Sequence, residues 1–492
     1  GTGAPHVSSY LSQPSLCQPD IVSKHIAAEV KQGYLIGPFP SSPFPVYRCS
    51  PIGVVDKKYS DKKRLIIDLS APRGNSVSTS INDLIDKDEY SLSYVRVDDA
   101  ITAIQQAGHG ALLCKTDIVD AFKLLPIHPS LWHLYGINWQ DNFYFFIRLA
   151  FGSRSSPKIF DQLSTAICWI AHHNYGINKM LHLLDDFLTI DAPCYDAERT
   201  MALLTLIFGR LGIPLAPHKT VGPTTTLEFL GIELDTIKME ARLPLVKLNR
   251  LLDLLDEFLL RRSCTKRQLL SLLGHLNFAC RVVPPGRTFM SRLIELSKGI
   301  QKLHHHVGIS SESKQDICMW KEFLSGWNGI SLFLDRYLTP APDMQLFTDA
   351  SGIGHGGYFR GYWFHERWAT NLRLDHDKTL SIAFQELYPI VVAALLWGHQ
   401  WTRKRILFHC DNMATVHIVN KGRSKSPSIM KLMRRLVITA ASHSFMFSAV
   451  HIPGKSNIIA DALSRFQTTR FREAAPSAQA IPCQIPSVVM FA

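Results

Sequence analysis

The stretch LHLLDDFLTI, residues 181–190, decides the fold of the first half of the chain. It places Asp185 and Asp186 side by side between two apolar runs, a pattern typical of a tight β-hairpin with both carboxylates at its tip. Adjacent carboxylates repel each other, so such a tip is costly unless cations neutralise it. Two Mg²⁺ ions could do so while binding a nucleotide triphosphate and activating a primer 3′ hydroxyl. The plain alternative is an exposed Asp-Asp turn.

Motifs on both sides of this hairpin follow one another in a definite order. Upstream lie KKRLIIDLS (62–70), TDIVDAF (116–122) and FGSRSSPKIF (151–160), and downstream lie PHKT (217–220) and LEFLGIEL (227–234). As an ordered set they resemble reverse transcriptases over about residues 45–300. TDIVDAF resembles the first catalytic motif, and LLDDF resembles the second, where YxDD is more usual. The others resemble, in the order given, the fingers hairpin, the template- and dNTP-contacting motif, the lysine-bearing motif and the primer grip.

This resemblance implies a two-metal polymerase site whose ligands are Asp117, Asp185 and Asp186. The ions would be Mg²⁺, with Mn²⁺ as the possible substitute. The resemblance also implies cationic side chains that hold the triphosphate and offset its charge, namely Arg64 and either Lys57 or Lys58. Lys219, in PHKT, would be the general acid for the pyrophosphate. The alternative for Lys219 is a solvated surface lysine.

Three further side chains are expected around the incoming nucleotide: Asp120, Phe122 and Phe151. Phe122 lies five residues after Asp117, where reverse transcriptases carry a bulky aromatic that packs against C2′ and excludes a ribose hydroxyl. The alternative for Phe122 is packing beneath the palm sheet. Phe151 is expected only to line the dNTP pocket. Leu184 replaces the more usual residue of the hairpin motif, which leaves the metal chemistry intact and can alter contacts with the sugar.

The C-terminal region places four acids at strand ends or on helices. They are Asp349 in LFTDAS, Glu386 in AFQELYP, Asp411 in LFHCDN and Asp461 in NIIADALSR, which opens the last helix. Such positions can converge on one side of a sheet, and convergent carboxylates are the usual cage for two Mg²⁺ ions in phosphodiester hydrolysis. Taken singly, each acid would be an ordinary surface charge.

The order of these acids and elements, βββαβαβα, resembles the ribonuclease H fold. The segment HIPGKSNIIADALSR (451–465) especially resembles the end of retroelement ribonucleases H. The resemblance implies that Asp349, Glu386, Asp411 and Asp461 bind two metal ions. His451, in a loop ten residues before Asp461, would assist product release or proton transfer. A loop position without a catalytic role is the alternative for His451.

The expected architecture is α/β and α+β multidomain: a right-hand polymerase with fingers, palm and thumb, followed by an RNase H-like α/β domain. The expected parts are an N-terminal extension (1–44), fingers and palm (45–240), helical thumb (241–300), connector (301–342), RNase H domain (343–468) and a linker or disordered tail (469–492). These boundaries follow from amphipathic helices within 243–300, a polar segment near 301–315, and a tail rich in Pro, Ala and Gln.

Composition limits the partners and the compartment. The 492 residues carry a net charge of +12, which favours polyanions through counterion release. The expected partners are an RNA template, a DNA primer, an RNA–DNA hybrid and dNTPs. Ten cysteines without a CxxC pair indicate reduced thiols in an intracellular protein of the cytoplasm or nucleus. The longest apolar run, residues 387–397, is too short for a bilayer and no signal peptide is evident, so no membrane partner is expected.

The combination of LLDDF, GHLNFACRVVPPGR (274–287) and ADALSR (460–465) looks most like DIRS-type tyrosine-recombinase retrotransposons. Ty3-type LTR elements and pararetroviruses share the same domain order. The sequence therefore predicts an RNA- and DNA-directed DNA polymerase with ribonuclease H activity. Two alternatives remain: a domesticated or decayed copy that binds nucleic acid without catalysis, and a ribonuclease H with a degenerate polymerase half. The presence of all seven metal-binding acids argues against decay.

Overall fold

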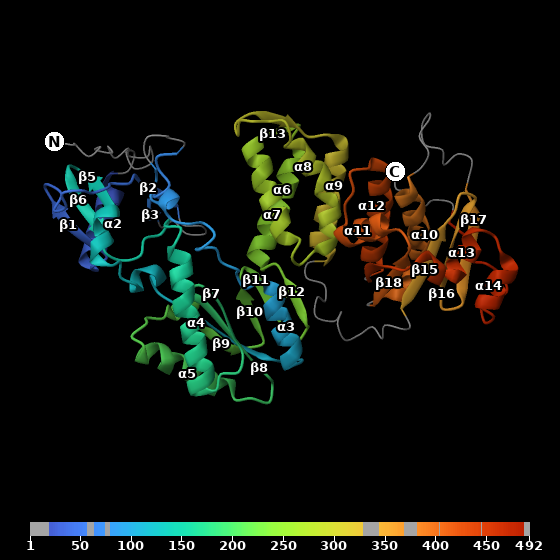
Figure 1. Cartoon of the computed structure of the whole chain (residues 1–492), viewed down its shortest axis with the longest axis horizontal. Helices are drawn as coiled ribbons and strands as arrows, with labels where there is room; N and C mark the ends of the chain where they lie inside the picture. The colour runs from blue at the N-terminus through green and yellow to red at the C-terminus, as the bar shows by residue number, and fades with distance from the viewer. Residues whose placement is uncertain are drawn as a thin grey trace. The chain divides into compact units, whose positions relative to one another are not determined.

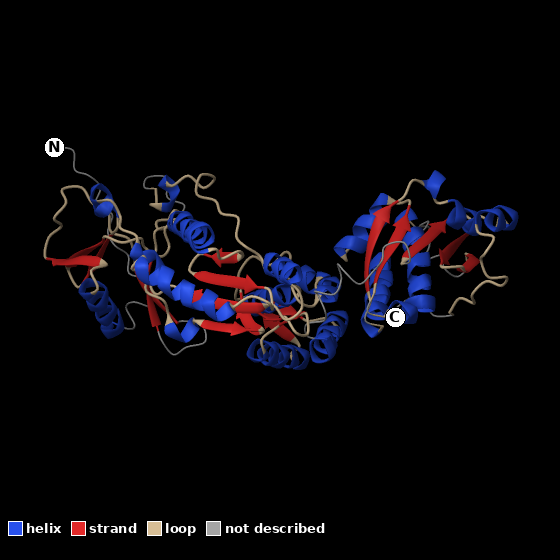
Figure 2. Cartoon of the chain, turned by 90° about the horizontal axis from the view of Figure 1, so that it is seen from below, coloured by secondary structure: helices blue, strands red, loops and turns tan. Residues whose placement is uncertain are grey.

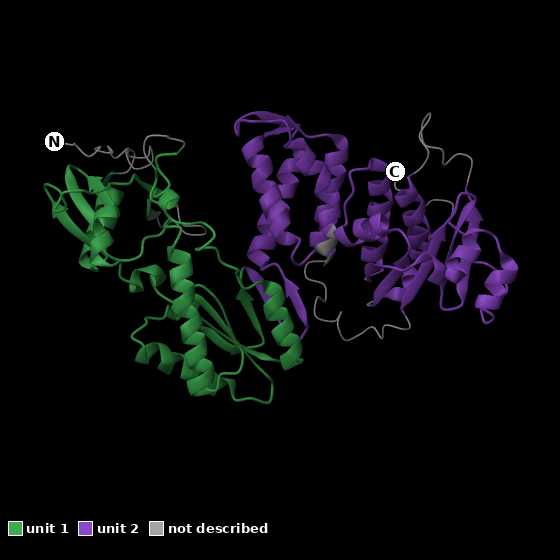
Figure 3. Cartoon of the chain, in the orientation of Figure 1, with its two compact units in different colours: residues 1–230 green, residues 231–492 purple. Residues whose placement is uncertain are grey.

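The computed structural model describes residues 19–56, 63–73, 79–327, 344–368, 381–402, 404–443 and 445–486. The chain divides into two compact units, residues 1–230 and residues 231–492, drawn in green and purple in Figure 3. Figure 1 labels the helices and strands of both units.

The first unit contains three sheets and four long helices among its described residues. In chain order its elements are α2 (Pro19–Lys31), β1 (Leu35–Phe39), β2 (Ile52–Asp56), β3 (Lys63–Ile67), α3 (Val97–Ala107), β4 (Leu112–Asp117), β5 (Gly136–Trp139), β6 (Asn142–Phe146), α4 (Ser156–Tyr175), β7 (Met180–Leu183), β8 (Asp186–Asp191), α5 (Ala197–Arg210), β9 (Val221–Thr224) and β10 (Thr226–Phe229).

The beginning of this unit is a small sheet, β1–β6–β5, with α2 packed against β1. Helix α2 buries Val22 and Ile26, which are four residues apart and therefore share one helical face. Strands β2 and β3 pair in an antiparallel register, with Ile52 opposite Ile67. This is the strand pair that the sequence predicts for the fingers.

The second part of the unit is a four-stranded antiparallel sheet in the order β7–β8–β4–β9. Helix α4 packs against β7, α5 packs against β4 and β9, and α3 packs against β8 (Figure 1). Side chains such as Leu113, Phe187 and Leu188 are fully buried between these layers. The strands that carry the first set of acids are therefore held in a closely packed sheet.

The second unit begins with two short strands, continues with a helical part and ends with an α/β domain. In chain order its elements are β11 (Ile232–Asp235), β12 (Glu240–Arg242), α6 (Leu245–Leu260), β13 (Ser263–Thr265), α7 (Lys266–Ala279), α8 (Ser291–Leu296), β14 (His306–Gly308), α9 (Ser311–Trp327), β15 (Gln345–Ala350), β16 (Gly354–Phe359), β17 (Tyr362–Arg367), α10 (Ile382–Trp397), β18 (Arg405–Cys410), α11 (Met413–Lys421), α12 (Pro427–Ser442), β19 (Met446–His451), α13 (Ile458–Ser464) and α14 (Thr468–Ala474).

The helical part of this unit contains α6 and α7, the amphipathic helices predicted within 243–300, and α9, which packs against α6. Helix α7 begins at a capping box, in which Thr265 and Gln268 satisfy each other's backbone amides. Asp316 of α9 forms a buried ion pair with Arg434 of α12, with an Nε–Oδ1 distance of 3.3 Å. This contact joins the helical part to the α/β domain.

The α/β domain is a five-stranded mixed sheet in the order β17–β16–β15–β18–β19. Strands β15, β18 and β19 are parallel to one another, while β16 and β17 run antiparallel. Helices α10 and α13 both pack against β15 and β16. Figure 2 shows the strands of this domain between helices. The strand and helix order is the one expected for an RNase H-like domain.

The tail differs from its predicted character as a linker or disordered end. In the described residues 469–486, α14 follows α13 directly, and Phe471 is 1 % exposed. The Trp363 indole donates a hydrogen bond to the Gln479 carbonyl at 2.7 Å, and Cys483 N–H donates to the Trp363 carbonyl at 2.8 Å. This packing is tertiary, so no helical or strand period reveals it in the sequence.

One segment, Ile382–Trp401, is long and apolar enough to cross a membrane by length and composition alone. It consists of α10 and the helical turn that follows. In the structure 67 % of the most apolar 18-residue stretch of this segment is buried inside the protein. Helix α10 packs against β15, β16 and α12. This burial is typical of the central helix of an α/β domain.

Candidate active sites

The first set of acids lies at the tip of the β7–β8 pair. Leu183 pairs with Asp186, which leaves Leu184 and Asp185 as the two turn residues. Leu184 has a φ of +54°, a left-handed conformation that costs a non-glycine residue roughly 1–2 kcal/mol. The Ser164 hydroxyl on α4 holds this turn by donating a hydrogen bond to the Leu184 carbonyl at 2.8 Å. The sequence analysis did not single out Ser164, because a serine within a helix gives no local signal of a distant partner.

Strand β4 brings the third acid to the same place. Asp117, the last residue of β4, stands opposite Asp186 in the β4–β8 register. The amide of Ile118 then donates a hydrogen bond to the Asp185 carbonyl at 3.1 Å. All three acids named by the sequence therefore meet at one edge of the sheet.

The electrostatics of this cluster favour cations. Burial raises the pKa of Asp185, and the charge of Asp117 raises it further. Burial raises the pKa of Asp186 to about 6, although the Lys115 ammonium acts in the opposite direction. A metal ion near these carboxylates would lower both pKa values, because it would stabilise the ionised forms that burial disfavours.

Two lysines already neutralise part of that charge. Lys219 Nζ donates hydrogen bonds to both Asp117 carboxylate oxygens at 2.9 Å. Burial alone would lower the pKa of Lys219, but the hydrogen bond and charge of Asp117 outweigh it and raise the pKa. Lys115 Nζ lies 3.1 Å from Asp186 Oδ2 and donates to the Glu228 carbonyl, also at 3.1 Å. Lys219 thus lies where the sequence places it, whereas Lys115 was missed.

One further observation supports the binding of divalent metal ions by this cluster. Asp186 Oδ1 is buried and has no hydrogen-bond partner within the protein. A buried carboxylate oxygen without a partner is costly, and a metal ion would satisfy it. Asp117, Asp185 and Asp186 are the residues that would hold such ions.

Three of the expected nucleotide-binding residues, Asp120, Phe122 and Phe151, lie within the described part of the chain. Asp120 has a φ of +50° and precedes the 3₁₀ turn Ala121–Leu124 that contains Phe122. The Phe122 ring lies 4.9 Å from the Phe151 ring and 5.5 Å from the Phe160 ring, measured between centroids. Phe122 is 8 % exposed, whereas Phe151 is 36 % exposed. The pocket-lining and core-packing interpretations of Phe122 are both compatible with this position.

The residues predicted to contact the triphosphate lie in or next to a segment that the structure does not describe. Arg64 lies in β3, with its backbone opposite Val55. Lys57 and Lys58 lie outside the described residues.

Asn82 is a residue that the sequence analysis missed. Its side-chain amide donates hydrogen bonds to the Gly152 carbonyl at 2.9 Å and to the Ser70 hydroxyl at 2.8 Å. Its carbonyl oxygen accepts from the Arg154 amide at 2.9 Å. At 6 % exposure, Asn82 fixes the turn that carries Phe151.

The second set of acids converges in the α/β domain. Asp349 lies on β15 and Glu386 on α10, and each is 4 % exposed. Asp411 follows β18, and Asp461 lies in the first turn of α13. The charges of Asp411 and Asp461 both raise the pKa of Asp349, and those of Asp349 and Asp411 raise the pKa of Glu386. Four acids from four separate elements therefore act on one another at short range.

Burial is the largest influence on the two innermost acids. It raises the pKa of Asp349 to about 6 and the pKa of Glu386 to about 9. Burial also raises the pKa of Asp411, against the nearby His451. These buried carboxylates offer the oxygen ligands that divalent cations bind. A bound cation would stabilise their ionised forms.

His451 lies beside this cluster. It is the last residue of β19, and its Nε2 lies 3.1 Å from the Asp411 carbonyl oxygen, within hydrogen-bonding distance. The sequence analysis expects His451 in a loop. The structure instead places it at the strand end, where its exposed ring still reaches Asp411.

Three residues that contact these acids were not predicted. The Ser464 hydroxyl on α13 donates a hydrogen bond to Asp349 Oδ2. Arg465 and Arg470 donate to the two carboxylate oxygens of Asp461. Burial would raise the pKa of Asp461, but these two arginines outweigh it and lower the pKa. Their only sequence signal is proximity to Asp461, which does not show where the side chains point.

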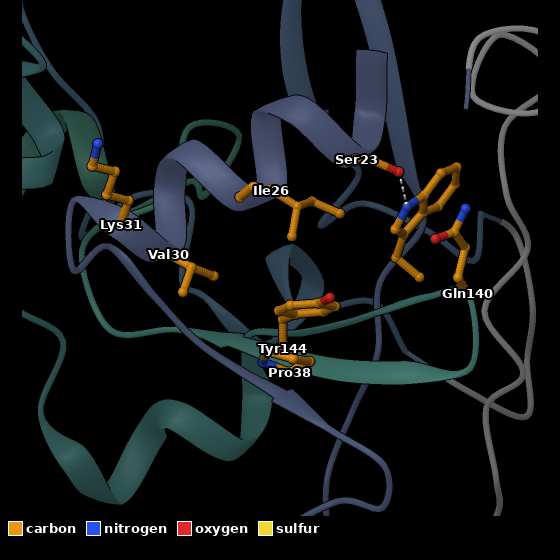
Figure 4. Close-up of a pocket in the computed structure, with 9 residues that line it drawn as sticks. Ser23, Ile26, Val30, Lys31, Pro38, Gln140 and Tyr144 are labelled. Atoms are coloured by element: carbon orange, nitrogen blue, oxygen red, sulfur yellow. Dashed lines mark hydrogen bonds between the residues drawn. The ribbon is translucent and has the colours of Figure 1, made fainter. Parts of the chain in front are cut away.

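A pocket in the first unit lies between α2 and the β1–β6 strands (Figure 4). Its lining residues are Ser23, Ile26, Ala27, Val30, Lys31, Pro38, Trp139, Gln140 and Tyr144. The Trp139 indole donates a hydrogen bond to the Ser23 hydroxyl at 2.9 Å. No carboxylate lines this pocket, so it does not offer the metal chemistry of either acid cluster.

The fold is shared with solved structures. The protein has the fold of a reverse transcriptase polymerase followed by an RNase H-like domain. It is similar to the foamy viral protease-reverse transcriptase in complex with dsDNA, with a TM-score of 0.53, 15% identity, and coverage of 92% of this chain and 86% of that chain. A second foamy viral structure, the protease-reverse transcriptase in complex with RNA/DNA hybrid, gives a TM-score of 0.53 and 14% identity, with coverage of 92% of this chain and 56% of that chain.

The chain is also similar in sequence to a curated viral protein. The chain is 20% identical over 400 residues to "Polyprotein P3" of Commelina yellow mottle virus. The match covers 78% of this chain but 19% of the polyprotein, so this chain corresponds to about a fifth of that relative's length. No protein-family model matches the chain.

Proposed function

We propose that this protein copies RNA and DNA templates into DNA and cleaves the RNA strand of RNA–DNA hybrids. The observation that carries the proposal is the meeting of Asp117, Asp185 and Asp186 at one sheet edge, with an unpartnered buried oxygen on Asp186. The separate cluster of Asp349, Glu386, Asp411 and Asp461 supports the second activity.

For polymerisation, Asp117, Asp185 and Asp186 would hold two Mg²⁺ or Mn²⁺ ions, which lower the pKa of the primer hydroxyl and offset charge on the phosphates. Lys219 is then the proton source for the departing pyrophosphate, because its ammonium lies 2.9 Å from Asp117. Arg64, together with Lys57 or Lys58, holds the triphosphate. Asp120, Phe122 and Phe151 surround the incoming dNTP.

For hybrid cleavage, the four acids of the second cluster would hold the ions that activate water and stabilise the departing oxygen. Ser464 fixes the orientation of Asp349 by its hydrogen bond. His451 is exposed and lies next to Asp411, which suits a role in proton transfer or release of the cleaved strand.

The natural substrates follow from the same proposal: an RNA template, a DNA primer, their hybrid and dNTPs. The net charge of +12 suits such polyanions. We assign the protein to a retrotransposon of the DIRS type on the motifs LLDDF, GHLNFACRVVPPGR and ADALSR. We further propose an intracellular location, in the cytoplasm or nucleus, and no membrane partner.

Two assays on the full chain test the proposal. Extension of oligo(dT) on poly(rA) and cleavage of a labelled RNA–DNA hybrid should both require Mg²⁺ or Mn²⁺ and both stop when the metal is chelated. Cleavage without extension would indicate a ribonuclease H with a degenerate polymerase half. Hybrid binding without either activity would indicate a domesticated or decayed protein, and the proposal would then be wrong.

A further inference from the structure

The second acid cluster contains a sulfur atom as well as carboxylates. Cys410 is the last residue of β18 and is fully buried. Its Sγ lies 3.8 Å from Glu386 Oε2 and accepts a hydrogen bond from the Asn412 amide at 3.4 Å. Ligand atoms of Glu386, Cys410 and Asp411 all lie within 4.8 Å of one another, and no other such group of three occurs among the described residues.

These distances suit a single cation with mixed ligands. Typical Zn–S and Zn–O bonds of about 2.3 Å and 2.1 Å, at a tetrahedral angle, separate the sulfur and oxygen by roughly 3.6 Å. The 3.8 Å between Cys410 Sγ and Glu386 Oε2 is close to that value. Asp411 is the most exposed of the three residues, so its carboxylate has the most freedom to move toward a bound ion.

The donor set also distinguishes between kinds of cation. Mg²⁺ binds oxygen ligands and gains little from a sulfur, whereas Zn²⁺ and Cd²⁺ bind thiolate strongly. We propose that Glu386, Cys410 and Asp411 form a binding site for a thiophilic divalent cation, of the Zn²⁺ or Cd²⁺ type, that displaces Mg²⁺ from this cluster. Binding breaks the Sγ–H bond, forms an Sγ–metal bond and releases the proton to solvent, with no change of oxidation state.

The first cluster does not offer the same donors. The cysteine closest in sequence to Asp117 is Cys114, whose Sγ contacts the Ala197 carbonyl of α5 at 3.8 Å. The contacts of Asp117 and Asp186 with Lys219 and Lys115 involve nitrogen and oxygen alone. A thiophilic cation should therefore inhibit hybrid cleavage at concentrations that leave primer extension intact. That consequence rests on the proposed ribonuclease function, whereas cation binding does not.

The test measures binding and inhibition separately on the full chain. Cd²⁺ is titrated in excess Mg²⁺ while the ultraviolet absorption of the cadmium–thiolate bond is recorded. The wild type should show a tight component that Cys410→Ser loses and that Cys264→Ser, a control for another fully buried thiol, retains. Glu386→Gln and Asp411→Asn keep the thiol but should weaken this component by roughly tenfold or more.

Zn²⁺ inhibition of hybrid cleavage is measured on the same proteins, each relative to its own rate without Zn²⁺. Cys410→Ser should need roughly tenfold more Zn²⁺ than wild type for half inhibition. If the tight Cd²⁺ component survives in Cys410→Ser, or is not weakened in Asp411→Asn should the serine variant fail to fold, the proposed site is wrong. Loss of that component in a protein without hybrid cleavage would support the cation site and reject the ribonuclease function.

Discussion

The two acid clusters compensate their negative charge in different ways. In the first, lysines pair with Asp117 and Asp186, and burial raises the pKa of Asp186 to about 6, as it does for Asp349 of the second cluster. In the second, the innermost acids contact a serine hydroxyl and a thiol, and Glu386 reaches a pKa of about 9. The arginines of that cluster bind only its outermost member, Asp461.

This difference separates two ways of preparing a metal site. In the first cluster, ammonium groups hold Asp117 and Asp186, and incoming ions must displace or rearrange them. The second keeps a buried carboxyl protonated at neutral pH, so binding of ions there must release a proton. The two clusters should therefore respond differently to mutation and to pH.

The largest expected effect on activity comes from two isosteric substitutions, one in each cluster. Asp185→Asn should reduce primer extension by roughly 1,000-fold or more while leaving hybrid cleavage, because it removes a charge from the first metal site alone. Asp349→Asn should do the reverse. Single-turnover extension and cleavage on the same preparations measure both. Retained polymerisation in Asp185→Asn, or normal cleavage by Asp349→Asn, would show that the corresponding site is misassigned.

A substitution of Lys115 tests whether lysines offset the negative charge of the first cluster. Lys115→Met keeps most of the side-chain volume but removes the ammonium between Asp186 and the Glu228 carbonyl. Extension should fall by about 10- to 100-fold, since the Asp186 carboxylate loses its orienting partner. The loss should be largest at low Mg²⁺, and hybrid cleavage should be unaffected. Lys179→Met, a substitution of a lysine for which no contact with these acids is described, is the matched control.

The sequence predicts the acids of both clusters better than it predicts their partners. Asp117, Asp349 and Asp411 lie at or just after strand ends, so local pattern and motif order place them correctly. Lys115 is different, because a lysine two residues before Asp117 indicates a shared strand face but not a partner on β8. Ser464 and Cys410 acquire their roles only when α13 and α10 pack on the sheet.

The structure of α14 likewise depends on tertiary contacts that the local sequence does not show. Helix α14 has seven residues, too few to be stable alone, and it is held where Phe471 meets the Trp363 ring at a centroid distance of 4.8 Å. Composition alone indicates a linker there, because alanine- and proline-rich segments usually lack an apolar face. The partner that supplies the missing face, β17, lies about a hundred residues earlier in the chain.

Glu386 gives the clearest pH dependence. Its pKa is raised to about 9 by burial, so the folded, metal-free protein binds a proton that the unfolded chain releases above its ordinary value of 4.5. The stability contributed by this proton is therefore present at low pH and is lost as the pH rises toward 9. Glu386→Gln, which is neutral throughout, should stabilise the metal-free protein at pH 7 by on the order of 1–3 kcal/mol.

Denaturant unfolding of the metal-free chain at several pH values checks this expectation. The gain should vanish below about pH 4.5, where the wild-type carboxyl is protonated in both states. Asp186→Asn should give a smaller gain that appears as the pH rises above about 3.8 and is complete above about 6, because the pKa of Asp186 is raised less than that of Glu386. Equal gains from both substitutions at pH 7 would mean that the two clusters compensate their charge alike.

A further expected effect concerns sugar choice in the first site. Phe122 packs between Phe151, which is partly exposed, and Phe160, which is fully buried. If its exposed edge meets C2′ of the nucleotide, a ribose hydroxyl would overlap the ring or shift the reacting atoms, and a shift of about 1 Å can cost on the order of 100-fold in rate. Phe122→Ala should then raise UTP incorporation relative to dTTP by up to about that factor.

The core-packing interpretation makes a different prediction for the same variant. A buried Phe→Ala substitution costs roughly 3–5 kcal/mol of stability and would lower activity toward both nucleotides equally. Phe160→Ala, which deletes the fully buried neighbour, is the matched control and should lose stability without changing the preference. Single-nucleotide incorporation kinetics with dTTP and UTP on one template distinguish the two. An unchanged preference in Phe122→Ala would assign Phe122 to the core and remove it from the nucleotide site, while the acids of the first cluster would keep their proposed role.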